Sequence, residues 1–142
     1  MNRFSLLLLA GLTGGLALAH ETVNAGNVQL EWHTNTNELL QVKGDSVLTL
    51  SMKVKDQLLK PSDCRCTVLL YAGEVNPRVK PVILETAPSE EGTLDAVVTA
   101  PKAGVYSIVV DAKPVNLNLF TAFRSVIKIE AVEDVYNTLE KK

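Results

Sequence analysis

The stretch Val47-Leu48-Thr49-Leu50-Ser51-Met52-Lys53-Val54 alternates large apolar residues with mostly polar ones. A period of two residues is typical of a β-strand that buries one face and exposes the other. Residues 28–33 repeat the pattern more strictly, with Val28, Leu30 and Trp32 on one face and polar side chains on the other. These two stretches predict half-buried strands and place Trp32 in the core.

Further apolar or alternating runs follow, and turn residues separate them at regular intervals. The runs cover residues 64–72, 79–86, 94–100, 105–112 and part of 117–129. Short strands with turns every 8–12 residues are typical of an all-β sandwich or barrel. The tail differs, because Val132, Val135, Tyr136 and Leu139 recur at helical spacing. That spacing predicts a short C-terminal helix packed by one apolar stripe, with a frayed, partly disordered end as the alternative.

Residues 100–110, Ala-Pro-Lys-Ala-Gly-Val-Tyr-Ser-Ile-Val-Val, combine a Pro and Gly turn with Gly-x-Tyr and alternating apolar positions. This segment resembles the sixth strand of immunoglobulin-like sandwiches, and the resemblance implies that Tyr106 is the corner tyrosine. Gly44-Asp45 before one strand and Lys60-Pro61 before the next resemble small exported domains of the YtkA and CopC type. We therefore expect an immunoglobulin-like Greek-key sandwich of about seven strands.

Residues 1–19 are typical of a secretory signal peptide. Arg3 supplies the positive start, residues 4–12 the apolar region, and Ala17-Leu18-Ala19 an A-x-A cleavage site. The apolar region is too short to span a membrane, which takes about 20 residues. We expect a mature chain of residues 20–142, one exported domain in the periplasm or outside the cell, with no transmembrane segment.

Composition excludes some classes of function. The full chain has 14 basic and 16 acidic residues, and loss of Arg3 leaves a net charge of about −3. This chain lacks the basic surface that nucleic-acid binding needs. No nucleophile elbow and no Gly-rich phosphate loop is present. We therefore predict no nucleic-acid partner and no enzyme activity.

Cleavage after Ala19 would leave His20 as the first residue, and His33 is the only other histidine. The N-terminal amine and the imidazole of His20 together form a chelating pair of nitrogens. If Asn24-Ala25-Gly26-Asn27 makes a hairpin turn, His20 lies opposite Glu31 and diagonal to His33. Three nitrogens with a carboxylate suit copper(II). The predicted metal site is therefore His20, His33 and, as a weaker ligand, Glu31.

The resemblance to the CopC type adds one residue to this site. Copper-handling proteins of that type begin their mature chains with histidine, which matches His20. They also carry an aspartate and a histidine late in the domain. Here Asp111 is followed by Ala112, Lys113 and Pro114, and no histidine lies beyond His33. The resemblance therefore supports His20 alone.

Cys64 and Cys66 are a second candidate pair. Thiolates at Cys-x-Cys spacing suit copper(I), and Met52 could add a thioether. On a strand, however, both cysteines face the same side as Val68 and Leu70, which favours structural or disulfide-bonded cysteines. A disulfide over this spacing is expected to need a local turn. A redox role is a third alternative.

Two interpretations of function follow. The first is a small exported copper carrier or chaperone that exchanges metal with a partner. The second is a metal-free interaction or accessory domain that docks another exported protein through a sheet edge or face. An oxidative enzyme built on a histidine brace is a weaker alternative, because the mature chain is small for a substrate platform.

Overall fold

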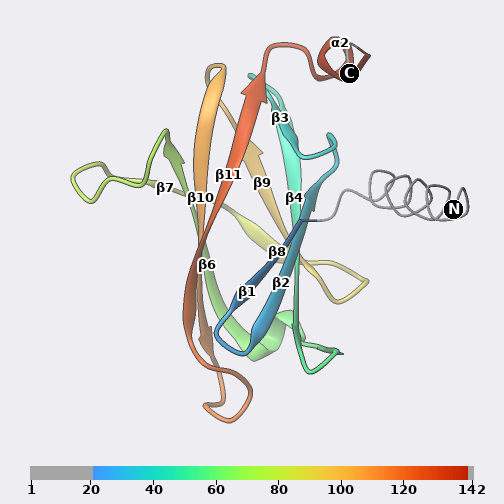
Figure 1. The fold of residues 1–142 in the computed structure, drawn as a ribbon, viewed down its shortest axis with the longest axis vertical. Coiled ribbons are helices and arrows are strands. Elements are labelled where there is room, and N and C mark those ends of the chain that lie inside the picture. Colours follow the sequence, from blue (N-terminus) through green and yellow to red (C-terminus); the bar gives the residue numbers. More distant parts are fainter. Residues whose placement is uncertain (1–20, 141–142) are drawn as a thin grey trace, which may run out of the picture.

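The computed structural model describes residues 21–140, and strands of two β-sheets form more than half of them (Figure 1). The first sheet contains β1 (Glu21–Ala25), β2 (Val28–Thr34), β4 (Asp45–Val54), β5 (Gln57–Leu58), β8 (Thr86–Pro88) and β9 (Leu94–Thr99). The second contains β3 (Leu39–Gln41), β6 (Cys64–Ala72), β7 (Val82–Ile83), β10 (Gly104–Pro114) and β11 (Phe123–Val132). A 3-10 turn, η1 (Pro61–Asp63), precedes β6, and a short helix, α2 (Val135–Glu140), follows β11.

The order of the strands is that of an immunoglobulin-like sandwich. The first sheet runs β1-β2-β4-β9-β8, and the second runs β3-β11-β10-β6-β7. In immunoglobulin terms, β2, β4, β9 and β8 correspond to strands A, B, E and D, while β6, β10 and β11 correspond to C, F and G. The predicted fold class is confirmed.

The core lies between the two sheets, where the alternating residues of each strand meet. On β2, every second residue from Val28 to Thr34 is buried. Leu48, Leu50 and Met52 do the same on β4, as the period of two predicted. Trp32 is 6% exposed, so its predicted core position is confirmed. Burial of these apolar side chains supplies the main driving force for folding.

Tyr106 forms the corner that the resemblance implied. Its side chain is buried, and its hydroxyl donates to the carbonyl oxygen of Lys102 at 2.7 Å. The same hydroxyl oxygen accepts the Lys102 backbone N–H at 3.3 Å. The two hydrogen bonds of the Tyr106 hydroxyl therefore hold the turn that leads into β10.

Two predicted elements differ from the structure. The single strand predicted over residues 79–86 is wrong, because the chain forms β7 in one sheet and β8 in the other. Leu84 lies between them and is buried, so the chain changes sheets where it crosses the core. The strands β3 and β5 are too short to show a period and were not predicted.

The predicted C-terminal helix exists, but the predicted apolar stripe is wrong. Val132 belongs to β11, and Tyr136 is 81% exposed. Of the residues in the predicted stripe, Val135 is the one that is fully buried within the helix, at 3% exposure. Its N–H donates to Gln41 Oε1 at 3.1 Å. The buried Val135 side chain holds the helix to β3 together with the Gln41 side chain, which accepts the Val135 N–H and donates to the carbonyl oxygen of Glu133 at 2.7 Å. No helix within residues 21–140 is long and apolar enough to cross a membrane.

Candidate functional site

The β1–β2 hairpin determines which residues the N-terminal segment meets. Its turn consists of Gly26 and Asn27, with Ala25 paired to Val28. Gly26 has φ 61°, a conformation that favours glycine, and Gly at the first turn position is typical of a type II′ hairpin. Asn27 Oδ1 also accepts the N–H of Thr121 at 2.9 Å. The turn is therefore tight and tethered.

This turn changes the register that the sequence suggested. A four-residue turn would have paired Val23 with Val28 and His20 with Glu31. In the structure Val23 pairs with Leu30, Thr22 with Glu31 and Glu21 with Trp32. The predicted pairing was wrong because the chain reverses in two residues instead of four. His20 lies outside the described residues.

His33 lies on the outer face of the first sheet, as predicted, and is half-buried there. It pairs with Thr49 of β4, which in turn pairs with Asp95 of β9. Neighbouring strands lie about 4.8 Å apart, so these three residues form a row across the sheet. Thr49 Oγ1 donates to Asp95 Oδ1 at 2.9 Å, which orients the carboxylate.

An open pocket of about 380 Å³ surrounds His33. Its other lining residues are Thr49, Ser89, Glu90, Glu91, Thr93 and Asp95. Glu90 and Glu91 are exposed in the turn between β8 and β9. Sequence spacing could not associate these carboxylates with His33, because only the pairing of β2, β4 and β9 brings them together.

Glu31 shares the outer face with His33 but has its own partner. Its carboxylate lies 3.8 Å from Lys53 Nζ, and both side chains are about one-third exposed. Within residues 21–140, no three side chains of His, Cys, Asp or Glu are grouped so as to hold a metal ion. The described residues therefore contribute His33, with Glu31 nearby, as donors to any site at this face.

Cys64 and Cys66 are joined by a disulfide. Both are half-buried against the core, on the same side of β6 as Val68 and Leu70. The expectation of a local turn was wrong, since both residues lie within the strand with Cα atoms 5.4 Å apart. With the sulfur atoms joined, neither cysteine offers a thiolate to a metal. Met52 is 4% exposed and packs in the core.

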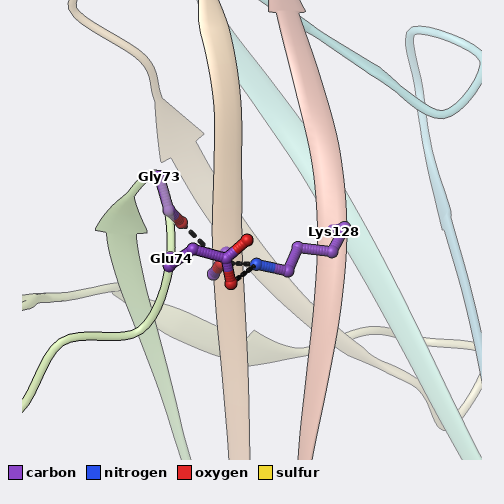
Figure 2. A network of polar contacts seen from close by, with 4 residues as sticks. Gly73, Glu74 and Lys128 are labelled. Carbon is purple, nitrogen blue, oxygen red and sulfur yellow. Dashed lines mark hydrogen bonds and ion pairs between the residues drawn. The ribbon is translucent and has the colours of Figure 1, made fainter.

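A serine and a lysine also meet on the second sheet, and such a pair can catalyse acyl transfer when the hydroxyl is accessible. Lys128 Nζ donates to Ser107 Oγ at 2.9 Å and pairs with Glu74 (Figure 2). Ser107 is fully buried, however, and its hydroxyl donates to the carbonyl oxygen of Gly73 at 2.6 Å. The contact therefore joins β6, β10 and β11 and offers no nucleophile.

An apolar row crosses the outer face of the second sheet. Val126, Val109, Leu69 and Ile83 are successive partners from β11 through β10 and β6 to β7. Val109 is fully buried, whereas Val126 is 44% and Ile83 69% exposed. Directly paired residues share a face, so the four side chains are contiguous.

Comparison with known proteins supports the fold alone. No family model matches the sequence, and no curated protein matches it. A DUF4426 family protein from Pseudomonas aeruginosa PAO1 is similar in structure, with a TM-score of 0.57, 13% identity, and coverage of 80% of this chain and 98% of that one. FetP of uropathogenic E. coli strain F11 has a TM-score of 0.52 and 10% identity, over 79% of this chain and 93% of its own. The filamin domain of Lin-41 has a TM-score of 0.48 and 14% identity, over 80% and 100%.

Proposed function

We propose that the mature chain is an exported copper(II)-binding protein whose ligands are the N-terminal amine and imidazole of His20 together with the imidazole of His33. In this proposal residues 1–19 are a signal peptide, and its cleavage during export frees that amine. Nitrogen donors are those that copper(II) prefers in tetragonal geometry. Glu31, two residues before His33 on the same face, is a weaker carboxylate ligand in this proposal.

The observation that supports this proposal is the register of the first hairpin. Its ladder ends with Glu21 paired to Trp32. The next residue outward on one side is His20, and on the other side it is His33. Continuation of the ladder by a single pair would set the two histidines directly opposite each other. Directly opposed Cα atoms are about 4.5–5.5 Å apart, a distance at which two imidazoles can share one metal ion.

The electrostatic surroundings of His33 favour a cation. Glu90, Glu91 and Asp95 line the same pocket, and among residues 21–140 no lysine or arginine does. The negative charges of carboxylates around an open pocket raise the local concentration of cations. Because the pocket is open, a bound ion could pass to another protein without unfolding of the domain. A carrier or chaperone that delivers metal to an exported partner fits this arrangement better than an enzyme.

Titration with copper(II) tests the proposal, and the protein must begin at His20. We expect one equivalent of copper to produce a visible absorption band, which either H20A or H33A abolishes. Loss of an outer-shell partner of a metal ligand already lowers affinity about 10–100-fold, so loss of a ligand should lower it by at least about tenfold. E31Q should weaken binding less than H33A does.

Two controls isolate the site. Q29A changes the same outer face of β2 without removing a proposed ligand, and it should bind copper as the unaltered protein does. One extra alanine before His20 removes the amine from the proposed position and should reduce affinity as strongly as H33A. If H20A and H33A both retain the stoichiometric band, the proposed site does not exist.

The apolar row Val126–Val109–Leu69–Ile83 favours a second function, that of a metal-free docking domain. Val126 and Ile83 are exposed at the two ends of this row, and exposed apolar surface on a sheet face is typical of a protein interface. The copper titration separates the two proposals, because docking through this row makes no use of His20 or His33. A chain that binds no copper with an authentic N-terminus would favour the docking function.

A further inference from the structure

The Cys64–Cys66 disulfide lines an open pocket of about 400 Å³. The remaining lining residues are Pro61, Ser62, Thr86, Pro88 and Leu94. They come from η1 and from β8 and β9 of the opposite sheet, so the pocket lies where the edge strand β8 meets β6. Both cysteines are half-buried. A thiol can therefore reach the bond without unfolding of the sandwich.

This disulfide adds little to the stability of the fold. It closes a loop with a single intervening residue, Arg65, and cross-links stabilise a folded chain less as the closed loop becomes shorter. It also lies at the end of the ladder between β6 and β10, where Cys64 pairs with Pro114. Proline has no N–H to give to that ladder. Reduction of the bond should therefore leave the sheet intact.

The bridge shortens the start of β6 relative to an ordinary extended strand. Residues two apart on an extended strand have Cα atoms about 6.6–6.8 Å apart. The bridge holds those of Cys64 and Cys66 at 5.4 Å. Breaking the bond allows β6 to regain the ordinary spacing at its first residues. A disulfide that constrains its own strand is suited to exchange, whereas a structural disulfide joins separate elements.

The pocket walls are fixed and chemically mixed. In η1, the Lys60 N–H donates to Asp63 Oδ2 at 3.0 Å and the Asp63 N–H to Lys60 O at 2.9 Å. Pro61 further restricts this turn. Pro88 and Leu94 offer apolar contact to the residue that carries an incoming thiol. Ser62 and Thr86 bring hydroxyl groups that can donate hydrogen bonds to a thiolate.

We propose that Cys64 and Cys66 form a thiol–disulfide exchange site that accepts two electrons from a dithiol. A thiolate of the dithiol attacks one sulfur, which forms a mixed disulfide and releases the other cysteine as a thiolate that takes up a proton. The second thiolate of the dithiol then attacks its own sulfur in the mixed disulfide and releases the remaining cysteine. The dithiol becomes a disulfide, and the Cys64–Cys66 bond becomes two thiols.

Reduction kinetics test this site. The mature protein is treated with dithiothreitol in the presence of a metal chelator, and free thiols are counted by alkylation and intact mass. We expect complete reduction under native conditions, one oxidised dithiothreitol per reduced protein, and an unchanged far-ultraviolet circular dichroism spectrum. Thr86→Trp narrows the pocket and should slow reduction about tenfold, because exchange rates depend on access.

Thr67→Trp is the matched control. Thr67 is exposed on the opposite face of β6, next to Cys66, so the same substitution there should leave the reduction rate unchanged. Cys64→Ser and Cys66→Ser each leave one thiol, and at least one of these variants should form a mixed disulfide with oxidised glutathione. The proposal fails if reduction requires denaturant, if T86W and T67W are reduced at equal rates, or if neither single-cysteine variant forms the adduct. Since copper is chelated throughout, these outcomes are independent of the proposed metal site.

Discussion

At the scale of single residues, burial and hydrogen-bond partners determine whether a polar side chain is structural or accessible to a ligand. Tyr106 is buried, so its hydroxyl must find a partner, and the Lys102 backbone supplies both an acceptor and a donor. His33 is half-buried beside carboxylates in an open pocket, where a metal ion can reach it. Ser107 lies fully buried and is committed to the carbonyl oxygen of Gly73. Accessibility therefore separates the functional candidates from the structural residues.

Tyr106→Phe should destabilise the domain by about 1–2 kcal/mol. The variant keeps the ring but removes the hydroxyl, which leaves the Lys102 carbonyl without its side-chain donor. Urea denaturation followed by circular dichroism should show a lower midpoint and an unchanged slope. Tyr136→Phe is the control. Because Tyr136 is 81% exposed, this variant should unfold at the same urea concentration as the unaltered protein. Equal midpoints for the two variants would mean that the corner hydrogen bond does not stabilise the turn.

At the scale of elements, strands with a clear local sequence pattern were predicted, whereas features that depend on tertiary contacts were not. The strands β2, β4, β6, β9 and β10 each carry a period of two or a continuous apolar run, and their predicted ranges lie close to the observed ones. The division of residues 79–86 between two sheets could not be predicted, because it depends on where Leu84 meets the core. The hairpin register likewise depends on Gly26 adopting a positive φ, which composition alone does not reveal.

Engineered cross-links can verify the hairpin register. Thr22 is paired directly with Glu31 in the structure, so T22C/E31C should form a disulfide under mild oxidation. The four-residue turn would instead pair Thr22 with Gln29, and T22C/Q29C is the matched alternative. In the observed register Thr22 and Gln29 are diagonal neighbours about 7–8 Å apart, near or beyond disulfide reach. Peptide mapping by mass spectrometry identifies the bond, and cross-linking of T22C/Q29C alone would reject the register.

At the scale of the whole molecule, the apolar row lies apart from the other two candidate regions, whereas the His33 pocket and the disulfide pocket adjoin at the turn between β8 and β9, where Ser89 and Thr93 follow and precede Pro88 and Leu94. The His33 pocket lies on the outer face of the first sheet, and the apolar row lies on the outer face of the second. The disulfide pocket lies where β8 meets β6. Substitutions in the apolar row should therefore leave the two pockets unaffected, since distant sites without shared contacts behave additively.

The sequence allowed the sandwich, the buried Trp32 and the corner Tyr106 to be predicted, because each depends on a short local pattern. It also allowed His33 to be placed on the outer face of β2. The carboxylates around His33 could not be predicted from the sequence, because β9 and the turn before it are connected to β2 only through β4. The pocket beside Cys64 and Cys66 was equally hidden, because β8 belongs to the opposite sheet.

The central claim is that His20 and His33 bind one copper(II) ion together. Electron paramagnetic resonance of the copper(II) protein tests it most directly, with an authentic His20 terminus and histidines labelled with ¹⁵N. We predict hyperfine coupling to two histidine imidazoles in the unaltered protein and in Q29A, and loss of this two-imidazole spectrum in H33A. Identical spectra for the unaltered protein and H33A would show that His33 is not a ligand and would contradict the claim.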